Sequence, residues 1–348
     1  MKEILSISHN KRAQLFQEAT ERSPNIHNPI IIEKDFWVCW ALNQIFTSPT
    51  LSPHITFKGG TSLSKCYNVI DRFSEDIDLT LSKPYIGIID NNDPIFATTS
   101  SQRGKRLEQL SYAVKSKIAT NVKPTLIDEF KKSLSPYFND KDWKLTTDEK
   151  DEQSLIFHYP SSLEKAADGY IDISIKLEFG ARGDSSPCET KTISPYVQQL
   201  LSELFESPPI IKVNTLTAKR TFWEKATLLH AEYHRDPQKH LPGRMFRHYY
   251  DIVMLDKNNL TREALQDIAL LNDVVKNKVI YFPSKWANYD KAKIGSLHLY
   301  PNDVFIEALK QDSHKMTEMF FGDAPDFDNI LSKIKQIEDT INRKQDIS

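Results

Sequence analysis

The chain has 348 residues, of which 39% are apolar and 26% are charged, so it is long enough for two domains of ordinary globular composition. The formal net charge of −2 excludes a polycation, and any contact with nucleic acid must come from a local patch. Cys39, Cys66 and Cys188 are far apart, which excludes a zinc knuckle or a disulfide framework. With neither a signal-peptide core nor an apolar run long enough for a membrane span, we expect a cytoplasmic protein without membrane contact.

Apolar periodicity predicts the elements of the first part of the chain. Helical spacing predicts amphipathic helices at residues 10–21 and 33–46. The cleanest strand is predicted at 170–179, where Ile171, Ile173, Ile175 and Leu177 share one face. The other elements expected here are a strand at 55–57, a glycine turn at 59–62 that leads into a helix through residue 67, a strand at 77–81, a mobile loop at 83–103, a helix at 106–120, and strands at 143–145 and 155–159.

The pattern changes after Ser207-Pro208-Pro209 and a strand expected at 210–213. From there the sequence predicts helices at 217–234, 243–255, 262–280, 303–320 and 327–343. Strands followed by helices predict an α+β protein, with a catalytic domain at 1–215 and a helical domain at 216–348.

Asp76 and Asp78 follow the glycine pair Gly59-Gly60 and lie beside buried-type residues of a predicted strand. Two residues separated by one share a face of a strand, so both carboxylates can bind the same cations, and Mg²⁺ prefers such oxygen ligands. Two metals about 3.5–4 Å apart stabilise the attacking and leaving oxygens of a displacement at phosphorus. Glycines let phosphate approach the backbone, and a helix start adds N–H donors, with Thr61 or Ser62 as a further hydroxyl donor. Together these features predict nucleotidyl transfer.

A third carboxylate is expected from the strand at 170–179. Its polar face carries Asp172 and Glu178, and we favour Glu178 because it ends the strand where a site would open. The alternative is a solvated face of a half-covered sheet. Two other Asp-x-Asp pairs occur, Asp140/Asp142 and Asp326/Asp328, but neither follows a strand and glycine pair, so we interpret them as solvated turns.

Several stretches resemble the AbiEii/AbiGii-type nucleotidyltransferase toxins, a branch of the polymerase β-like superfamily found in bacterial toxin–antitoxin and phage-defence systems. The stretches are Glu33-Lys34-Asp35-Phe36-Trp37, Lys58-Gly59-Gly60-Thr61-Ser62-Leu63, Arg72-Phe73-Ser74-Glu75-Asp76-Ile77-Asp78-Leu79, Lys176-Leu177-Glu178, Arg220-Thr221-Phe222-Trp223-Glu224-Lys225 and Arg247-His248-Tyr249-Tyr250-Asp251. The resemblance implies a polymerase β-like domain with a mixed sheet, two Mg²⁺ ions and an NTP substrate. The 15 residues between Gly60 and Asp76 exceed the usual superfamily spacing and match the toxin branch.

The resemblance also implies roles for Lys225 and Asp251. Lys225 would contact nucleotide phosphate from the rim of the helix at 217–234, where the alternative is a solvated charge. Asp251 would complete the site from the helical domain. Arg244, Arg247, His248 and Asp251 share a helix face, so the alternative is that Asp251 pairs with Arg247. We interpret Glu33-Lys34-Asp35 as a helix start and packing feature.

Basic residues are in excess between residues 212 and 247, with eight Lys/Arg against three acidic residues. Such a stretch suits a triphosphate and a phosphodiester acceptor, and the alternative is a mixed-charge helical surface. The resemblance implies an RNA acceptor, with the tRNA 3′ end as our expectation, and a cognate antitoxin. The rival hypotheses are a nucleotidyltransferase for a protein or small molecule, and a catalytically inert module that binds RNA or antitoxin on the same fold.

Overall fold

The computed structural model describes residues 1–164, 171–206 and 210–343 and forms two compact units. The sheet unit comprises Met1–Cys66, Phe73–Ala181 and Cys188–Thr215, and the helical unit comprises Tyr67–Arg72, Arg182–Pro187 and the chain from Leu216 onward. The chain passes for the last time from the sheet unit to the helical unit between Thr215 and Leu216. The two short segments 67–72 and 182–187, which the sequence placed in the first domain, belong to the helical unit.

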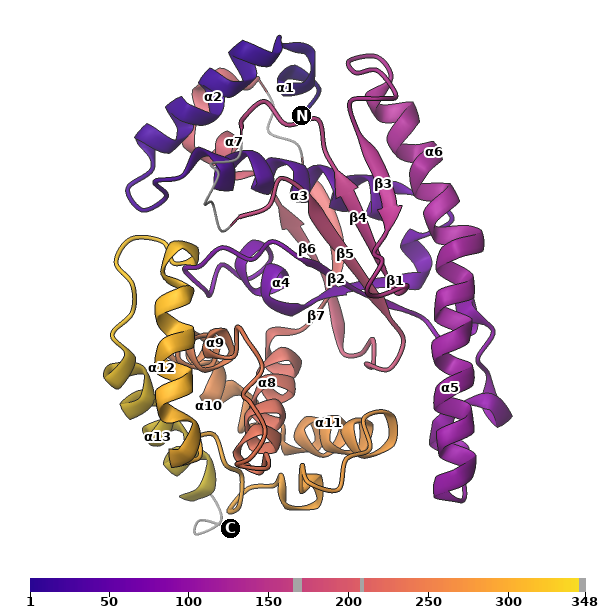
Figure 1. The fold of residues 1–348 in the computed structure, drawn as a ribbon, viewed down its shortest axis with the longest axis vertical. Coiled ribbons are helices and arrows are strands. Elements are labelled where there is room, and N and C mark those ends of the chain that lie inside the picture. Colours follow the sequence, from indigo (N-terminus) through magenta and orange to yellow (C-terminus); the bar gives the residue numbers. More distant parts are fainter. Residues whose placement is uncertain (165–170, 207–209, 344–348) are drawn as a thin grey trace. The chain divides into compact units, whose positions relative to one another are not determined.

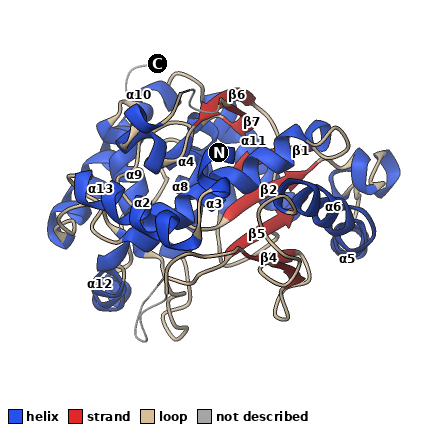
Figure 2. Cartoon of the chain, turned by 90° about the horizontal axis from the view of Figure 1, so that it is seen from above, coloured by secondary structure: helices blue, strands red, loops and turns tan. Residues whose placement is uncertain are grey.

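A seven-stranded sheet forms the centre of the sheet unit, in the order β3-β4-β5-β2-β1-β7-β6 (Figures 1 and 2). Its strands are β1 (Ile55–Lys58), β2 (Ile77–Leu81), β3 (Lys144–Thr147), β4 (Ser154–His158), β5 (Ile175–Gly180), β6 (Cys188–Ile193) and β7 (Ile211–Leu216). β2 is antiparallel to β1 and parallel to β5, while β4 is antiparallel to β5. The sheet is therefore mixed, and the predicted α+β class is confirmed.

The helices of the sheet unit come mainly from its N-terminal half. They are α1 (Lys2–Ser6), α2 (His9–Arg22), α3 (Pro29–Thr47), α4 (Gly59–Lys65), α5 (Ser100–Lys117), α6 (Lys123–Leu134) and α7 (Tyr196–Leu200). α3 begins where Asn28 accepts a hydrogen bond from the Ile30 N–H and Pro29 occupies the first turn. Both features favour a helix start. The Asn28 side chain pairs with an N–H that has no partner inside the helix, and proline has no N–H to leave unpaired.

An aromatic core joins α3 to α6 and the sheet. The Trp40 ring lies 4.8 Å from Phe130 of α6 and 5.5 Å from Phe157 of β4, and Trp37 stacks on Tyr159 at 5.6 Å. On β5, Ile175, Leu177 and Phe179 are buried, whereas Lys176 and Glu178 lie on the other face. Strand alternation thus separates a packed face from a face that carries the candidate carboxylates.

Several predicted elements of the sheet unit differ from the structure. The strand expected at 170–179 begins only at Ile175, and Tyr170 lies outside the described residues, as do Ser207-Pro208-Pro209. The glycine pair forms the first turn of α4 itself rather than a turn before it. The segment expected as a loop at 83–103 contains three short 3₁₀ turns and the start of α5. α6, which follows α5 through one π-helical turn, and β6 were not predicted.

The described residues of the helical unit form mainly helices and connecting turns, together with one isolated antiparallel β-bridge between Arg72 and Phe320. The helices are α8 (Ala218–Tyr233), α9 (Phe246–Lys257), α10 (Leu260–Ala264), α11 (Ile268–Tyr281), α12 (Ile306–Lys315) and α13 (Phe327–Arg343). The single helix expected at 262–280 is divided because Asp267 caps α11 with its side chain, which needs a non-helical backbone there. Within the described ranges, none of the helices has both the length and the apolar character needed to cross a bilayer.

The aromatic core predicts a large loss of stability for Trp40→Ala. Trp40 is 1% exposed, and removing a buried tryptophan side chain costs about 3–5 kcal/mol, the range seen for large-to-small changes in cores. Tyr112→Ala is the matched control, because Tyr112 lies in the same unit and is 74% exposed, so its removal should cost within about 0.5 kcal/mol. Urea unfolding followed by near-UV circular dichroism measures both. Equal midpoints for the two variants would show that the Trp40 cluster is not the core.

Candidate active site

Asp78 lies directly against the backbone of Gly59. In the β1–β2 register Lys58 pairs with Asp78, and the chain continues from Lys58 into Gly59 with a φ of +81°. A Cβ atom built on Gly59 would lie 1.9 Å from the Asp78 Oδ2 atom, which is far inside van der Waals contact. Both the positive φ and the close carboxylate therefore require glycine at this position. The structure brings together the glycine pair and the second aspartate of the Asp-x-Asp motif.

Glu178 is the carboxylate that the sheet aligns with Asp78. β2 and β5 run parallel, and Asp78 pairs with Glu178 in their register. Both residues are half-buried, on the face opposite the buried Leu79 and Leu177, and Asp76 is half-buried immediately before β2. Neighbouring strands lie about 4.8 Å apart, so side chains in register on one face are adjacent.

Asp172 is not placed on this face. It precedes β5, its side chain is exposed, and its backbone carbonyl accepts a hydrogen bond from Lys34 Nζ at 2.8 Å. The late start of β5 is the physical reason, because residues before Ile175 are outside the strand and do not follow its alternation. Of the two candidates for a third carboxylate, Glu178 is the one in register with Asp78.

Lys176 supplies a positive charge among these carboxylates. Its Nζ atom lies 2.7 Å from Glu178 Oε1 and 3.6 Å from Asp148 Oδ2. Burial alone would lower the pKa of Lys176, but the hydrogen bond and charge of Glu178 and the charges of Asp148 and Asp76 outweigh it and raise the pKa. The carboxylates thus create a negative field that stabilises a cation at this edge of the sheet.

The donor chemistry fits a hard divalent cation, but the side chains are not arranged around one. Within residues 1–164, 171–206 and 210–343, no group of three His, Cys, Asp or Glu side chains has the spacing of a metal site. Glu178 is engaged by Lys176 instead, so it would have to exchange this partner to join Asp76 and Asp78 as a ligand. Carboxylate oxygens are the ligands that Mg²⁺ prefers, and the aspartates supply them from one short stretch.

The hydroxyl groups of Thr61 and Ser62 in α4 form hydrogen bonds with backbone carbonyl groups of the protein itself. Thr61 Oγ1 donates to the backbone carbonyl of Asp76, and Ser62 Oγ donates to the carbonyl of Gly59 at 2.9 Å. Both residues are buried. Thr61 therefore ties α4 to the start of β2, and neither hydroxyl is presented to solvent as the extra phosphate donor that the sequence suggested.

Three buried charges of α3 hold the surroundings of the site. Glu33 accepts hydrogen bonds from Ser161 Oγ and the Ser162 N–H, both at 2.6 Å. Lys34 Nζ lies 2.6 Å from Glu75 Oε2, beside Asp76 in the chain. Asp35 pairs with Lys65 of α4 at 2.6 Å. The Glu33-Lys34-Asp35 stretch is thus a set of buried ion pairs and hydrogen bonds, consistent with a packing feature, and it lies within α3 rather than at its start.

In the helical unit, Asp251 of α9 is completely buried and neutralised by two cations. Arg72 donates to both carboxylate oxygens, with Nε–Oδ1 at 2.7 Å and Nη2–Oδ2 at 2.8 Å, and Lys225 Nζ lies 2.8 Å from Oδ2. Burial alone would raise the pKa of Asp251, but Arg72 and Lys225 outweigh it and lower the pKa. The structure therefore brings Lys225 and Asp251 together, and Asp251 pairs with Arg72 rather than with Arg247.

Lys225 is not the exposed rim lysine that the helix pattern suggested, because it is 7% exposed and its ammonium group faces Asp251. Burial lowers the pKa of Lys225, while Asp251 raises it and Arg72 lowers it further. His248 Nδ1 lies 3.4 Å from Lys225 Nζ. The two close partners hold the ammonium group of this buried lysine in one orientation.

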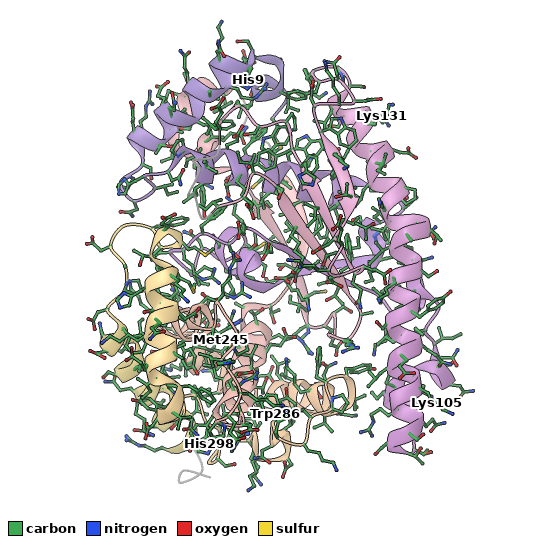
Figure 3. All side chains as sticks on the ribbon, viewed as in Figure 1. His9, Lys105, Lys131, Met245, Trp286 and His298 are labelled. Atoms are coloured by element: carbon green, nitrogen blue, oxygen red, sulfur yellow. The ribbon has the colours of Figure 1, made fainter. Side chains whose placement is uncertain are left out.

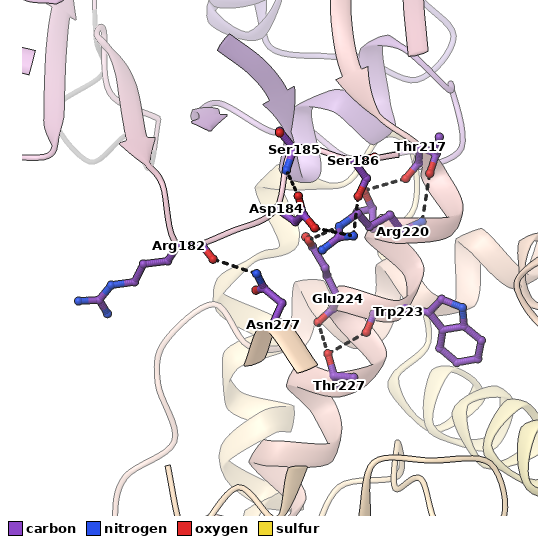
Figure 4. Close-up of polar contacts among 11 residues, drawn as sticks. Arg182, Asp184, Ser185, Ser186, Thr217, Arg220, Trp223, Glu224, Thr227 and Asn277 are labelled. Carbon is purple, nitrogen blue, oxygen red and sulfur yellow. Dashed lines mark hydrogen bonds and ion pairs between the residues drawn. The ribbon is translucent and has the colours of Figure 1, made fainter. Parts of the chain in front are cut away.

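The basic stretch at 212–247 does not form one cationic face. Arg220 is 2% exposed and donates to the Ser186 carbonyl and to Glu224, Lys225 is buried against Asp251, and Arg235 pairs with Glu232. Because these basic side chains are paired, the stretch agrees better with the alternative of a mixed-charge helical surface. Figure 4 shows the Arg220 contacts at the start of α8.

Three cations form ion pairs with carboxylates that the sequence did not predict: Lys34, Arg72 and Lys176. All three occur in the stretches that carried the family resemblance, so the signal was present. Lys34 binds Glu75, which is 41 positions away, and Arg72 binds Asp251, which is 179 positions away. Lys176 binds Glu178 on the same face of β5. Local periodicity contains no information on such long-range pairing.

Gly59→Ala should displace Asp78 and so remove the binding of divalent cations. The added methyl group would overlap the Asp78 carboxylate and adopt an unfavourable positive φ. Two control variants separate the steric overlap from the backbone strain. Gly87→Ala has a positive φ of +79° but no atom within 4 Å of the added methyl group, and Gly104→Ala has neither the positive φ nor a close atom. We expect Mg²⁺ with NTP to raise the melting temperature of both controls as in the parent, but not of Gly59→Ala. An unchanged shift in Gly59→Ala would contradict this contact.

Stability should fall as the pH is lowered from 7 to 5. Burial lowers the pKa of His230 to about 4, and burial with the charges of Lys225 and Arg247 lowers the pKa of His248 well below its usual range. Below about pH 6.5 both histidines bind protons in the unfolded state but not in the folded state, so protonation favours unfolding. For His230 the free energy of unfolding should fall by an amount on the order of 1 kcal/mol after solvent screening, and His248 should lower it further. Asp251, with a lowered pKa, keeps its contribution throughout this window. Urea unfolding of parent and His230→Gln/His248→Gln measures the slope, and an equally steep fall in the variant would refute the assignment.

Comparison with known proteins agrees with this chemistry. The family model described as "Nucleotidyl transferase AbiEii toxin, Type IV TA system" matches residues 40–333. MenT4, a nucleotidyltransferase toxin from Mycobacterium tuberculosis H37Rv, aligns with 96% of this chain and 89% of its own at 13% identity and a TM-score of 0.43. JHP933 from Helicobacter pylori aligns with 89% of this chain and 92% of its own at 14% identity and a TM-score of 0.39.

A search of curated proteins gave no match. The structural scores below 0.5 add nothing to the family match, which covers most of the chain. A match of that extent decides the family. The chain belongs to the AbiEii nucleotidyltransferase toxins of type IV toxin–antitoxin systems.

Proposed function

We propose that this toxin is a Mg²⁺-dependent nucleotidyltransferase that transfers NMP from an NTP to an RNA acceptor, and that the acceptor is the tRNA 3′ end. The observation that carries the proposal is the register of Asp78 with Glu178 on neighbouring strands, against the bare backbone of Gly59. Carboxylates gathered beside a glycine backbone are the donors that a metal-bound triphosphate needs.

In this mechanism Asp76, Asp78 and Glu178 would hold two Mg²⁺ ions, for which Glu178 would have to exchange its present partner Lys176. When bound, the ions would neutralise the triphosphate and lower the pKa of an attacking hydroxyl. The backbone N–H groups of Gly59 and Gly60 orient the phosphates, as the first turn of α4 begins there. Within the helical unit Asp251 orients the ammonium group of Lys225, the lysine to which the family resemblance assigns a phosphate contact.

The reaction is a displacement at the α-phosphorus. The acceptor hydroxyl oxygen forms a bond to this phosphorus, the bond to the bridging oxygen of the β-phosphate breaks, and pyrophosphate leaves. The hydroxyl proton passes to a carboxylate of the Asp76/Asp78/Glu178 set. Electrostatic stabilisation of the charge on the leaving group supplies most of the rate increase in such transfers.

The biological setting follows from the family. A type IV toxin–antitoxin family implies an antitoxin partner, and we propose a cognate antitoxin protein that opposes this activity in the cytoplasm, where NTPs and tRNA are available. Loss of functional tRNA would stop translation and so limit phage growth, which accounts for abortive infection as the outcome.

Asp78→Asn should abolish nucleotide transfer while leaving the fold intact. The amide keeps the shape but removes the charge that binds Mg²⁺, and loss of a metal ligand of this kind lowers the rate by a factor of ~10³ or more. Asp328→Asn is the matched control, because it neutralises an exposed aspartate of another Asp-x-Asp pair. Purified proteins are incubated with radioactive NTPs, Mg²⁺ and total RNA, and RNA labelling is measured beside melting temperature.

Three results would decide against the proposal. Labelling by Asp78→Asn at the parent rate would remove Asp78 from the mechanism. Transfer by the parent to cell protein or to a small hydroxyl compound, with none to RNA, would change the acceptor class. A parent that neither transfers nucleotide nor binds Mg²⁺–NTP in calorimetry would be an inert module that binds RNA or antitoxin.

A further inference from the structure

We propose that an aromatic and basic surface after α11 binds single-stranded RNA. This inference rests on the proposed RNA acceptor and names the part of the helical unit that holds it. The surface, here called the Phe282–Trp286 surface, consists of Phe282 and Trp286 with the cations Arg182, Lys278 and Arg235. All five residues belong to the helical unit. Trp286 is labelled in Figure 3.

The two aromatic rings are exposed, which is unusual for such large apolar groups. Phe282 is 37% and Trp286 41% exposed, and Val279 on the last turn of α11 is 40% exposed. Neighbouring residues anchor the segment, because Tyr281 is 2% exposed and Ala287 is fully buried. The rings are therefore held at the surface by a packed backbone, and two large exposed aromatic groups four residues apart indicate a candidate interaction site.

Each ring is accompanied by cations. Lys278 Nζ lies 4.9 Å and the Arg182 guanidinium carbon 6.0 Å from the centre of the Phe282 ring. The Arg235 guanidinium carbon lies over the Trp286 ring, 5.1 Å from its centre, and Arg235 Nε and Nη2 both donate to the Glu232 carboxylate. Cations beside aromatic rings can pair with phosphates while nucleobases stack on the rings.

Arg182 is placed at this surface by a specific set of contacts. Asn277 of α11 donates to the Arg182 carbonyl at 3.2 Å, and Arg220 of α8 donates to the carbonyl of Ser186 in the same segment. Figure 4 shows the Arg182 side chain directed away from the Arg220 network. The segment 182–187 therefore carries an exposed guanidinium beside the end of α11.

The local charge favours a polyanion over a protein partner. Between residues 276 and 293 there are five lysines and one acidic residue, Asp290, in a chain whose net charge is −2. Lysine is depleted in the cores of protein–protein interfaces, whereas Lys/Arg with exposed aromatics is the composition of single-strand binding surfaces. Backbone phosphates and unpaired bases, such as those of a tRNA 3′ end, match both features.

The test uses the full chain and a fluorescein-labelled single-stranded RNA of about 20 nucleotides, without NTP or Mg²⁺. Phe282→Ala/Trp286→Ala should weaken binding by about 100-fold, because each lost stacking ring accounts for about tenfold. Phe96→Ala is the control, since Phe96 is 58% exposed but lies near Asp90 and Asp93 in the sheet unit. Fluorescence anisotropy measures the Kd, and melting temperature confirms folding.

A second variant tests charge without removing a ring. Arg182→Gln/Lys278→Gln removes the two cations over the Phe282 ring and should reduce the slope of log K against log salt by about 1.4, as ~0.7 is lost per phosphate contact on a single strand. RNA affinity within twofold of the parent in both double variants overturns the proposal. So does loss of binding to the purified antitoxin with RNA affinity unchanged, which would make the surface a protein interface.

Failure of this inference can be told apart from failure of the proposed function. If the parent labels RNA, and Phe282→Ala/Trp286→Ala labels it with the same KM, the function stands and this surface is wrong. If the parent transfers no nucleotide but its RNA affinity depends on the two rings, the surface stands and the reaction is wrong. Neither ring belongs to the proposed catalytic residues.

Discussion

The contact between the Asp78 carboxylate and the Gly59 backbone is the constraint on which the candidate site depends. β1 and β2 are antiparallel in a register that puts Lys58 opposite Asp78, so the residue after Lys58 must leave room for a carboxylate. Only glycine does so at a φ of +81°. The same register on the other side of β2 puts Glu178 beside Asp78. One strand thus brings the glycine turn and two carboxylates together.

Buried ion pairs hold these parts, although each pair alone is a weak source of stability. Lys34 binds Glu75, next to Asp76, and Lys65 binds Asp35 between α3 and α4. In the helical unit Arg72 and Lys225 share the buried Asp251. Arg72 is only four residues before Asp76 in the chain. We interpret these pairs as devices that fix orientation, since a buried charge without its partner is costly and so defines one arrangement.

Much of the sheet unit could be predicted, because its signals are local. The alternation in Ile77–Leu81 and the helical pattern at 33–46 need no distant partner. The strand was predicted at its observed bounds, and the helix was predicted within α3, which begins four residues earlier, at Pro29. Glu178 was favoured for its place at a strand end, but its alignment with Asp78 comes from the parallel register, which the sequence does not show. Lys225 was misplaced at a helix rim because its partner Asp251 comes from another helix. β6 was not predicted because its residues are mostly polar and only Ile193 is buried, so the strand lacks an apolar alternation.

The central claim is that Asp76, Asp78 and Glu178 bind the divalent cations of nucleotidyl transfer. A crystal structure of the protein with Mn²⁺ and a non-hydrolysable NTP analogue tests this most directly, because anomalous scattering locates the metal independently of the side chains. We expect two manganese peaks at Asp76 and Asp78, with Glu178 moved from Lys176 toward one of them and the α-phosphate bound to both. Manganese and triphosphate bound elsewhere, with Asp78 uncoordinated and Glu178 still paired with Lys176, would contradict it.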